Sequence, residues 1–415
     1  MKRRQRTILT IVLLVSVAWT SAKPILALQS EEGASAPASS KVQPTGEHKG
    51  QSVNCRTNLD SHNVDRLIEK GNYRQAIISL RHAKQCNSSD IALREQLIVA
   101  YLKSNQKRQA GEEAESAAQG ASPDGKIHLA HVLNANGDFS DAEAMLQHLV
   151  ESGVVLAGVH GELGVALLGR GQYEDSVREL GSAVQIDSSA EGYTLELARA
   201  LLSWGNYQTA LAFLEAIGGR FGENPTYLYE KAWAFYGMHR FSDAVDTLQS
   251  LLQQKPSWDL AQFSLGNAYW MQGHIAEAEK QYRVAIKLNS RSASYYVALG
   301  RVLRKNTDTL PEAISGLNEA INLEPHNVVA EFELALAYRS QRNYQKAKHL
   351  LEDVTAREPA MVDAHRVLGL VYYQLRAPDD GARQMAIAAG LETNELRQAG
   401  DRNSVTTSAD APAYQ

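Results

Sequence analysis

Two short stretches of this 415-residue chain carry residue types that could bind a phosphate or a metal ion. Residues 120–126 (GASPDGK) match the G-x-x-x-x-G-K spacing of a phosphate-binding loop, and His128 and His131 lie three residues apart, which puts both imidazoles on one face of a helix. A phosphate loop also needs a Ser or Thr after its lysine, where this chain has Ile127. A zinc site needs further ligands in a recognisable motif. We therefore expect neither a nucleotide nor a metal ion at these positions.

Sequence motifs of common hydrolases and redox enzymes are missing. The chain contains no H-E-x-x-H, G-x-S-x-G or C-x-x-C sequence, and its acidic residues are scattered over the polar faces of predicted helices. With 44% hydrophobic and 21% charged residues the composition is globular, and the net charge of −5 argues against nucleic-acid binding, which usually depends on a basic surplus. We expect a protein that is not an enzyme, needs no cofactor and binds no nucleic acid.

Residues 1–22 have the pattern of a secretory signal peptide. A basic start precedes the apolar stretch from Ile8 to Trp19, and the small residues Thr20-Ser21-Ala22 offer a cleavage site. This stretch of 12 residues is short for a transmembrane helix, which needs about 20. We expect export to the periplasm or the extracellular space. The alternative is an uncleaved segment that anchors the protein to the membrane.

Two other segments are poor in large apolar side chains. Residues 23–54 are predicted to be a flexible linker and residues 401–415 a disordered tail, because neither can bury a core.

Nearly everything between these ends repeats about every 34 residues. The motif G-x-[YF]-x-x-[AS] recurs, and the small residue that closes each copy marks ten anchor positions: Ala76, Ala110, Ala142, Ser176, Ala210, Ala244, Ala278, Ala313, Ala347 and Gly381. Apolar residues lie at helical spacing before and after each anchor, and the seven prolines of this region fall where helices should begin or end. A fixed period of this length predicts stacked helical hairpins.

These copies resemble tetratricopeptide repeats (TPR). The best copy reads Leu265-Gly266…Tyr269, Gly273…Ala278 and Tyr282…Ala285, which is similar to the Leu-Gly-x-x-Tyr, Ala, aromatic, Ala series of the family. The resemblance, which extends to bacterial TPR scaffold proteins, implies an all-α fold, a right-handed superhelical solenoid of about ten hairpins. A polar capping helix is expected at 391–400. The ten repeats are expected at 57–90, 91–122, 123–156, 157–190, 191–224, 225–258, 259–292, 293–327, 328–361 and 362–390.

The two cysteines flank the first predicted hairpin. Cys55 precedes its first helix and Cys86 lies near the end of its second, so an antiparallel hairpin would bring them close together. Because an exported protein meets oxidising surroundings, we predict a Cys55–Cys86 disulfide. The alternative is two unrelated thiols, with Cys86 packed against its own repeat.

By resemblance to the family, the first helices line a concave groove. Its expected positions are aromatic in repeats six and seven and basic in repeats eight to ten: Tyr229, Trp233, Tyr236, Phe263, Asn267, Trp270, Met271, Arg301, Arg304, Arg339 and Arg366. This pattern suits a peptide with hydrophobic anchors and acidic neighbours, and predicts a non-enzymatic, exported scaffold for protein–protein interaction. One alternative is that some of these side chains only pack against the next repeat. Another is a carbohydrate-binding accessory of cell-envelope or exopolysaccharide assembly, since aromatic grooves also stack on sugars.

Overall fold

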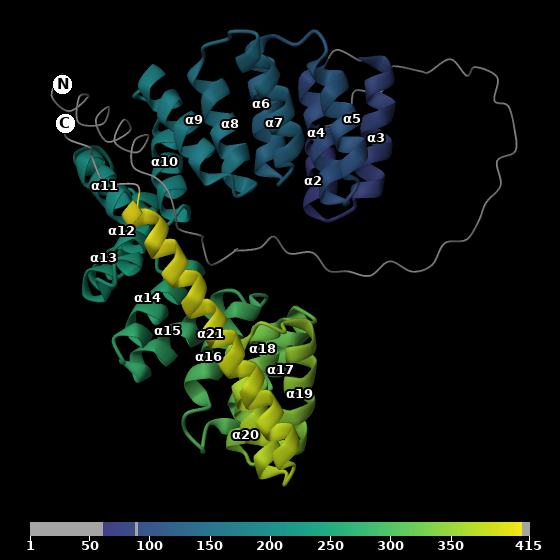
Figure 1. Cartoon of the computed structure of the whole chain (residues 1–415). Helices are drawn as coiled ribbons and strands as arrows, with labels where there is room; N and C mark the ends of the chain where they lie inside the picture. Colours follow the sequence, from purple (N-terminus) through teal and green to yellow (C-terminus); the bar gives the residue numbers. More distant parts are fainter. Residues whose placement is uncertain (1–60, 88–89, 409–415) are drawn as a thin grey trace, which may run out of the picture. The chain divides into compact units, whose positions relative to one another are not determined.

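The computed structural model describes residues 61–87 and 90–408, and every regular element within those ranges is an α-helix (Figure 1). The chain divides into two compact units, the first ending at His239 and the second beginning at Arg240. The helices of unit 1 are α2 (Ser61–Glu69), α3 (Tyr73–Cys86), α4 (Ile91–Lys103), α5 (Lys107–Ala118), α6 (Pro123–Ala135), α7 (Phe139–Glu151), α8 (Ala157–Gly169), α9 (Tyr173–Ile186), α10 (Glu191–Ser203), α11 (Tyr207–Phe221) and α12 (Pro225–Gly237). The helices of unit 2 are α13 (Phe241–Gln254), α14 (Asp259–Met271), α15 (Ile275–Leu288), α16 (Ala293–Leu303), α17 (Leu310–Leu323), α18 (Val328–Ser340), α19 (Tyr344–Arg357), α20 (Val362–Gln374) and α21 (Pro378–Ser408).

The helices alternate as the 34-residue period predicts. Even-numbered helices are the first helices of their repeats and odd-numbered helices the second. First and second helices pack on each other, as α8 does on α9 and α14 on α15, and first helices of successive repeats also touch, as α8 touches α10 and α16 touches α18. Side chains at equivalent positions of neighbouring first helices are therefore close enough to interact.

The anchor residues lie where the two helices of a repeat approach each other. The nine anchors from Ala76 to Ala347 have no exposed surface. Opposite Ser176, a Cβ added at Gly164 would lie 2.5 Å from Leu180 Cγ, so a larger side chain does not fit. The Ser176 hydroxyl is satisfied because it donates to the Gly164 carbonyl at 2.7 Å.

The turn within each hairpin explains the glycine of the sequence motif. The residue five positions before the anchor has φ of 74° at Gly71 and 79° at Gly273, in the left-handed region that glycine adopts without strain. The weaker copies keep this conformation with other residues, as at Arg342 and Arg376, which both have φ of 61°. A left-handed conformation costs a non-glycine residue about 1–2 kcal/mol.

We predict that Arg342→Gly stabilises unit 2 by about 0.5–1 kcal/mol. The substitution relieves the backbone strain, and the greater entropy of glycine in the unfolded chain offsets only part of this gain. Gly273→Ala is the matched opposite change. No atom lies within 4 Å of its new Cβ, so only backbone strain acts, and stability should fall by about 1 kcal/mol. Urea unfolding followed by circular dichroism measures both. A lower free energy of unfolding for Arg342→Gly would contradict the prediction.

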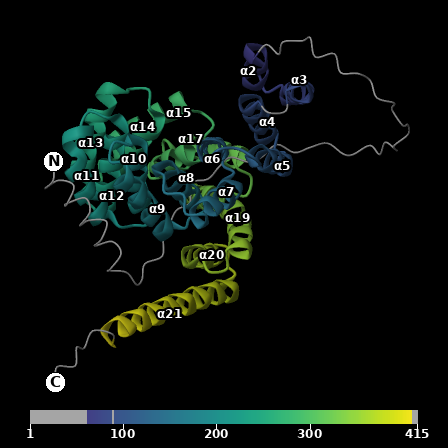
Figure 2. The same ribbon diagram turned by 90° about the horizontal axis from the view of Figure 1, so that it is seen from above.

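The C-terminal end differs from the prediction. The expected capping helix at 391–400 is not a separate element, because α21 runs without a break for 31 residues to Ser408, past the start of the predicted tail (Figure 2). Residues 382–399 are rich in Ala, Gln, Glu, Leu and Arg and contain no proline, so nothing ends the helix there. The predicted signal peptide, the linker, Cys55 and residues 409–415 lie outside the described residues. Within the described ranges, no helix is both long and apolar enough to cross a membrane.

Candidate binding surfaces on the first helices

The stretch that matches a phosphate loop is a helix cap. Helix α5, not a strand, precedes it, and Ser122 is the N-cap residue of α6, where its hydroxyl accepts a hydrogen bond from the Gly125 amide at 3.2 Å. Pro123 is the first residue of that helix. Ser followed by Pro is a common way to begin a helix, which accounts for the motif without a nucleotide.

The two histidines of α6 contact different carboxylates. His128 Nε2 lies 3.3 Å from Glu95 Oε2 on α4, and His131 Nδ1 lies 3.0 Å from Glu162 Oε1 on α8. Both imidazoles are more than half exposed, and they bridge successive repeats instead of meeting at one point. Within residues 61–87 and 90–408, no three His, Cys, Asp or Glu side chains come together as a metal site.

Two predicted groove residues of α14 take part in internal packing. The ring of Phe263 lies 4.7 Å from that of Tyr295 and 5.7 Å from that of Tyr282, measured between centroids. The Tyr282 hydroxyl donates to Asn267 Oδ1 at 2.8 Å. Phe263 and Asn267 are therefore half-buried and tie α14 to α15 and α16, as the packing alternative anticipated.

The other two predicted residues of α14 lie at its C-terminal end. The Lys305 ammonium, just after α16, lies 4.2 Å from the centroid of the Trp270 ring, a cation–π contact. Met271 is 46% exposed. An apolar side chain open to solvent thus stands next to a tryptophan that carries a positive charge over its ring.

Arg301 of α16 and Arg304, the C-cap residue of that helix, share one buried carboxylate. Arg301 Nε and Arg304 Nε donate to the two oxygens of Glu333 on α18, at 2.6 and 2.7 Å, and Glu333 is only 5% exposed. One negative charge thus faces two positive ones. Arg339 is half-buried and forms no ion pair with any other residue that the structure describes.

Trp270, Arg304 and Arg339 are equivalent positions in three successive repeats. We call the surface that they share with their neighbours the basic–aromatic surface; its residues are Trp270, Met271, Arg301, Arg304, Lys305 and Arg339. Arg366 has a different role, because it pairs with Asp363 at 2.7 Å and with Glu392 and thereby joins α20 to α21.

The remaining predicted residues, Tyr229, Trp233 and Tyr236, lie half-buried on α12 in unit 1. Next to this helix is a charged cluster that the sequence analysis missed. Arg199 of α10 donates through Nη1 to Glu196 at 2.8 Å and through Nε to Glu230 of α12 at 3.0 Å. Here one arginine serves two carboxylates, the reverse of the arrangement around Glu333.

These ion pairs repeat in register. His131 contacts Glu162, Arg199 contacts Glu230 and Arg301 contacts Glu333, at separations of 31, 31 and 32 residues. Each links the first helices of successive repeats, and the extra residue in the third pair is the insertion in repeat eight. The sequence analysis assigned these glutamates to solvated faces. The signal that could have found them is the 34-residue spacing of Glu162, Glu196 and Glu230.

Burial dominates the chemistry of Glu230, whose side chain is 1% exposed. Desolvation raises its pKa from the ordinary value of 4.5 to about 7, Arg199 opposes this shift, and the nearby Glu196 carboxylate adds to it. Burial also raises the pKa of Glu196, again against the effect of Arg199. Both carboxylates therefore lack part of the positive charge that would compensate for their burial.

We predict that unit 1 loses stability as the pH rises from about 4.5 to about 7, because folded Glu230 holds a proton in this window that the unfolded chain has released. Glu230→Gln should weaken this dependence, since the amide does not titrate. Glu215→Gln, at an exposed position on α11, is the control and should leave it unchanged. Urea unfolding at several pH values provides the comparison. Identical pH profiles for wild type and Glu230→Gln would rule out this role.

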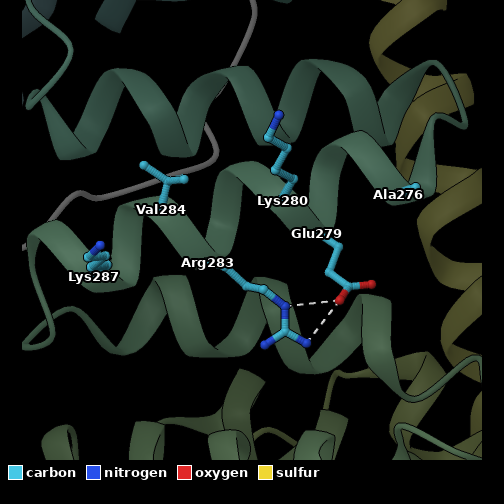
Figure 3. A pocket seen from close by; sticks show the side chains of 6 residues that line it. All are labelled: Ala276, Glu279, Lys280, Arg283, Val284 and Lys287. Atoms are coloured by element: carbon cyan, nitrogen blue, oxygen red, sulfur yellow. Dashed lines mark hydrogen bonds and ion pairs between the residues drawn. The ribbon is translucent and has the colours of Figure 1, made fainter.

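The second helices carry a shallow hollow on α15 (Figure 3). It is lined by Ala276, Glu279, Lys280, Arg283, Val284 and Lys287. Arg283 donates to Glu279 at 2.9 Å and also pairs with Glu312 of α17, so its charge is compensated within the protein. This hollow lies on a different helix from every residue of the basic–aromatic surface.

Sequence comparison identifies the repeats. The tetratricopeptide repeat model matches residues 128–191, 162–225, 195–259, 229–293, 263–325 and 332–390. These segments cover more than half of the chain, which therefore belongs to the tetratricopeptide repeat family. The expected family and all-α solenoid class are confirmed.

Several solved structures match the chain at low identity. The crystal structure of MamA is 23% identical over 40% of this chain and 96% of its own, with a TM-score of 0.37. YrrB, described as a TPR protein with an unusual peptide-binding site, is 18% identical over 46% of this chain and 96% of its own, with a TM-score of 0.37. A human IFIT1 dimer with m7Gppp-AAAA is 13% identical over 82% of this chain and 91% of its own, with a TM-score of 0.48. No curated protein sequence matches the chain.

Proposed function

We propose that this protein is a non-enzymatic, exported scaffold that binds a protein segment on the basic–aromatic surface of unit 2. Tetratricopeptide arrays typically serve protein–protein interaction, and this chain belongs to that family. The observation that carries the proposal is the charge balance around Glu333. One buried carboxylate serves Arg301 and Arg304, so positive charge is in excess there. Lys305 adds a further positive charge over the ring of Trp270, whose neighbour in the chain, Met271, is exposed.

The chemistry of this surface favours a partner segment with acidic and apolar side chains. Arginine forms strong charge-assisted hydrogen bonds with carboxylates, and Trp, Met and Arg are enriched where proteins bind each other. In the sequence, Lys305 precedes and Arg339 follows Glu333, whose carboxylate is shared, and both residues add positive charge. The overall charge of −5 makes this local surplus distinctive and argues against nucleic acid as the ligand.

A carbohydrate ligand is less well supported by the same geometry. Stacking on a sugar needs an open aromatic face. Phe263 instead packs against Tyr282 and Tyr295, and Lys305 lies over one face of Trp270.

We predict that Arg339→Glu weakens binding of a labelled peptide of alternating glutamate and leucine about tenfold, because an attraction becomes a repulsion. Lys287→Glu makes the same charge change on the exposed part of α15 and should alter affinity less than twofold. Fluorescence anisotropy measures both. If the two variants weaken binding equally, the peptide is held by the overall charge and the proposed surface fails.

Export and the disulfide belong to the same proposal. The signal-like N-terminus supports export, and Cys86 supports the bridge because it ends α3 at an exposed position. In the chain-entropy model, a bridge that closes a loop of about 30 residues stabilises by about 3–4 kcal/mol.

We predict that mass spectrometry of the proteolysed, unreduced exported protein finds the peptide with Cys55 linked by a disulfide to the peptide with Cys86. Cys86→Ser should lower the free energy of unfolding by about 3 kcal/mol in oxidising buffer and have little effect in reducing buffer. Free thiols at both positions would contradict the bridge, and an intact residue 1–22 segment in the mature protein would contradict cleavage.

A further inference from the structure

Unit 1 carries a charged cluster that the proposed function does not use. The carboxylates of Glu162, Glu196 and Glu230 lie on the first helices α8, α10 and α12, and each electrostatically affects the next. Among their partners in residues 61–87 and 90–408, only Arg199 is a permanent cation. Glu162 is held by the Asn134 amide, the Tyr193 hydroxyl and His131. Above about pH 7, where Glu230 is ionised as well, negative charge is therefore in excess at this surface.

A second observation points to a missing ligand group. Although Glu230 is almost completely buried, its Oε2 has no hydrogen-bond partner among the described residues, while Oε1 accepts from Arg199. A buried carboxylate oxygen without a donor is costly, and such an atom in a folded protein calls for an explanation. A cation or donor supplied from outside would compensate for this cost.

The same surface also carries two aromatic rings and a carboxylate that solvent can reach. Trp233 lies one helical turn after Glu230 on α12, and Tyr229 lies four residues before Trp233, on the same helix face. Both rings are half-buried. Glu196 is 25% exposed, so its carboxylate can be reached from solvent, in contrast to that of Glu230.

We propose that the first-helix surface of repeats five and six binds a lysine or arginine side chain of a protein segment. The cationic group pairs with Glu196, shares the excess charge of Glu230 and lies near the Trp233 ring. Aromatic rings attract cations through their faces, and carboxylates that share a single arginine leave one charge for a ligand. This site lies in unit 1 and is independent of the basic–aromatic surface, so either can fail without the other.

The test uses two labelled hexapeptides of alternating serine and lysine, one with free and one with Nε-acetylated lysines. We expect the free-amine peptide to bind the full-length protein at least tenfold more tightly than the acetylated one in fluorescence anisotropy. We also expect Glu196→Gln to weaken its binding at least tenfold. Glu215→Gln removes the same charge from the exposed face of α11 and should change affinity less than twofold.

Three results would overturn the proposal. Equal affinity for the two peptides would show that the wild-type protein does not recognise the amine, whatever the variants do. Equal weakening by Glu196→Gln and Glu215→Gln would show that only the overall charge attracts the peptide. Unchanged binding by Glu196→Gln would place the cation elsewhere.

Discussion

One small side chain is completely buried between two helices about every 34 residues, and this close contact determines how the array is built. The anchors from Ala76 to Ala347 have no accessible surface, and the space opposite Ser176 does not accept even a methyl group at Gly164. This contact holds the two helices of each repeat close together. A hairpin has only one such contact and must bury its remaining apolar faces against its neighbours, which is why the repeats stack.

Stacking in a constant register also explains the electrostatics. Because first helices of successive repeats touch at equivalent positions, a cation in one repeat meets a carboxylate in the next, as Arg199 meets Glu230 and Arg301 meets Glu333. The two ion pairs join equivalent positions, yet the ratio of arginines to glutamates is reversed. One arginine serves two glutamates in unit 1, and one glutamate serves two arginines in unit 2. One scaffold thus carries two surfaces of opposite charge without any change in its backbone design.

The sequence was sufficient for features that are periodic or local. The anchors, the helix-ending prolines and the turn glycines each have a steric cause that acts within one repeat, so they could be predicted. The ion pairs join residues more than 30 positions apart, and their partners are visible only when two repeats are stacked. The placement of Lys305 over Trp270 depends on the same stacking. The predicted C-terminal end was too short because a segment that cannot bury a core can still continue a helix when no residue such as proline interrupts it.

Both binding surfaces proposed above lie on the first helices and not on the second. Site-specific photocrosslinking distinguishes the two sets of helices. A photoreactive amino acid is placed either at Met271, which is exposed on α14, or at Lys280, which is exposed in the hollow of α15. In cells that make the full-length protein, we expect crosslinks to a discrete partner from position 271 and none from position 280. Crosslinks from position 280 alone would contradict it and place the partner on the second helices.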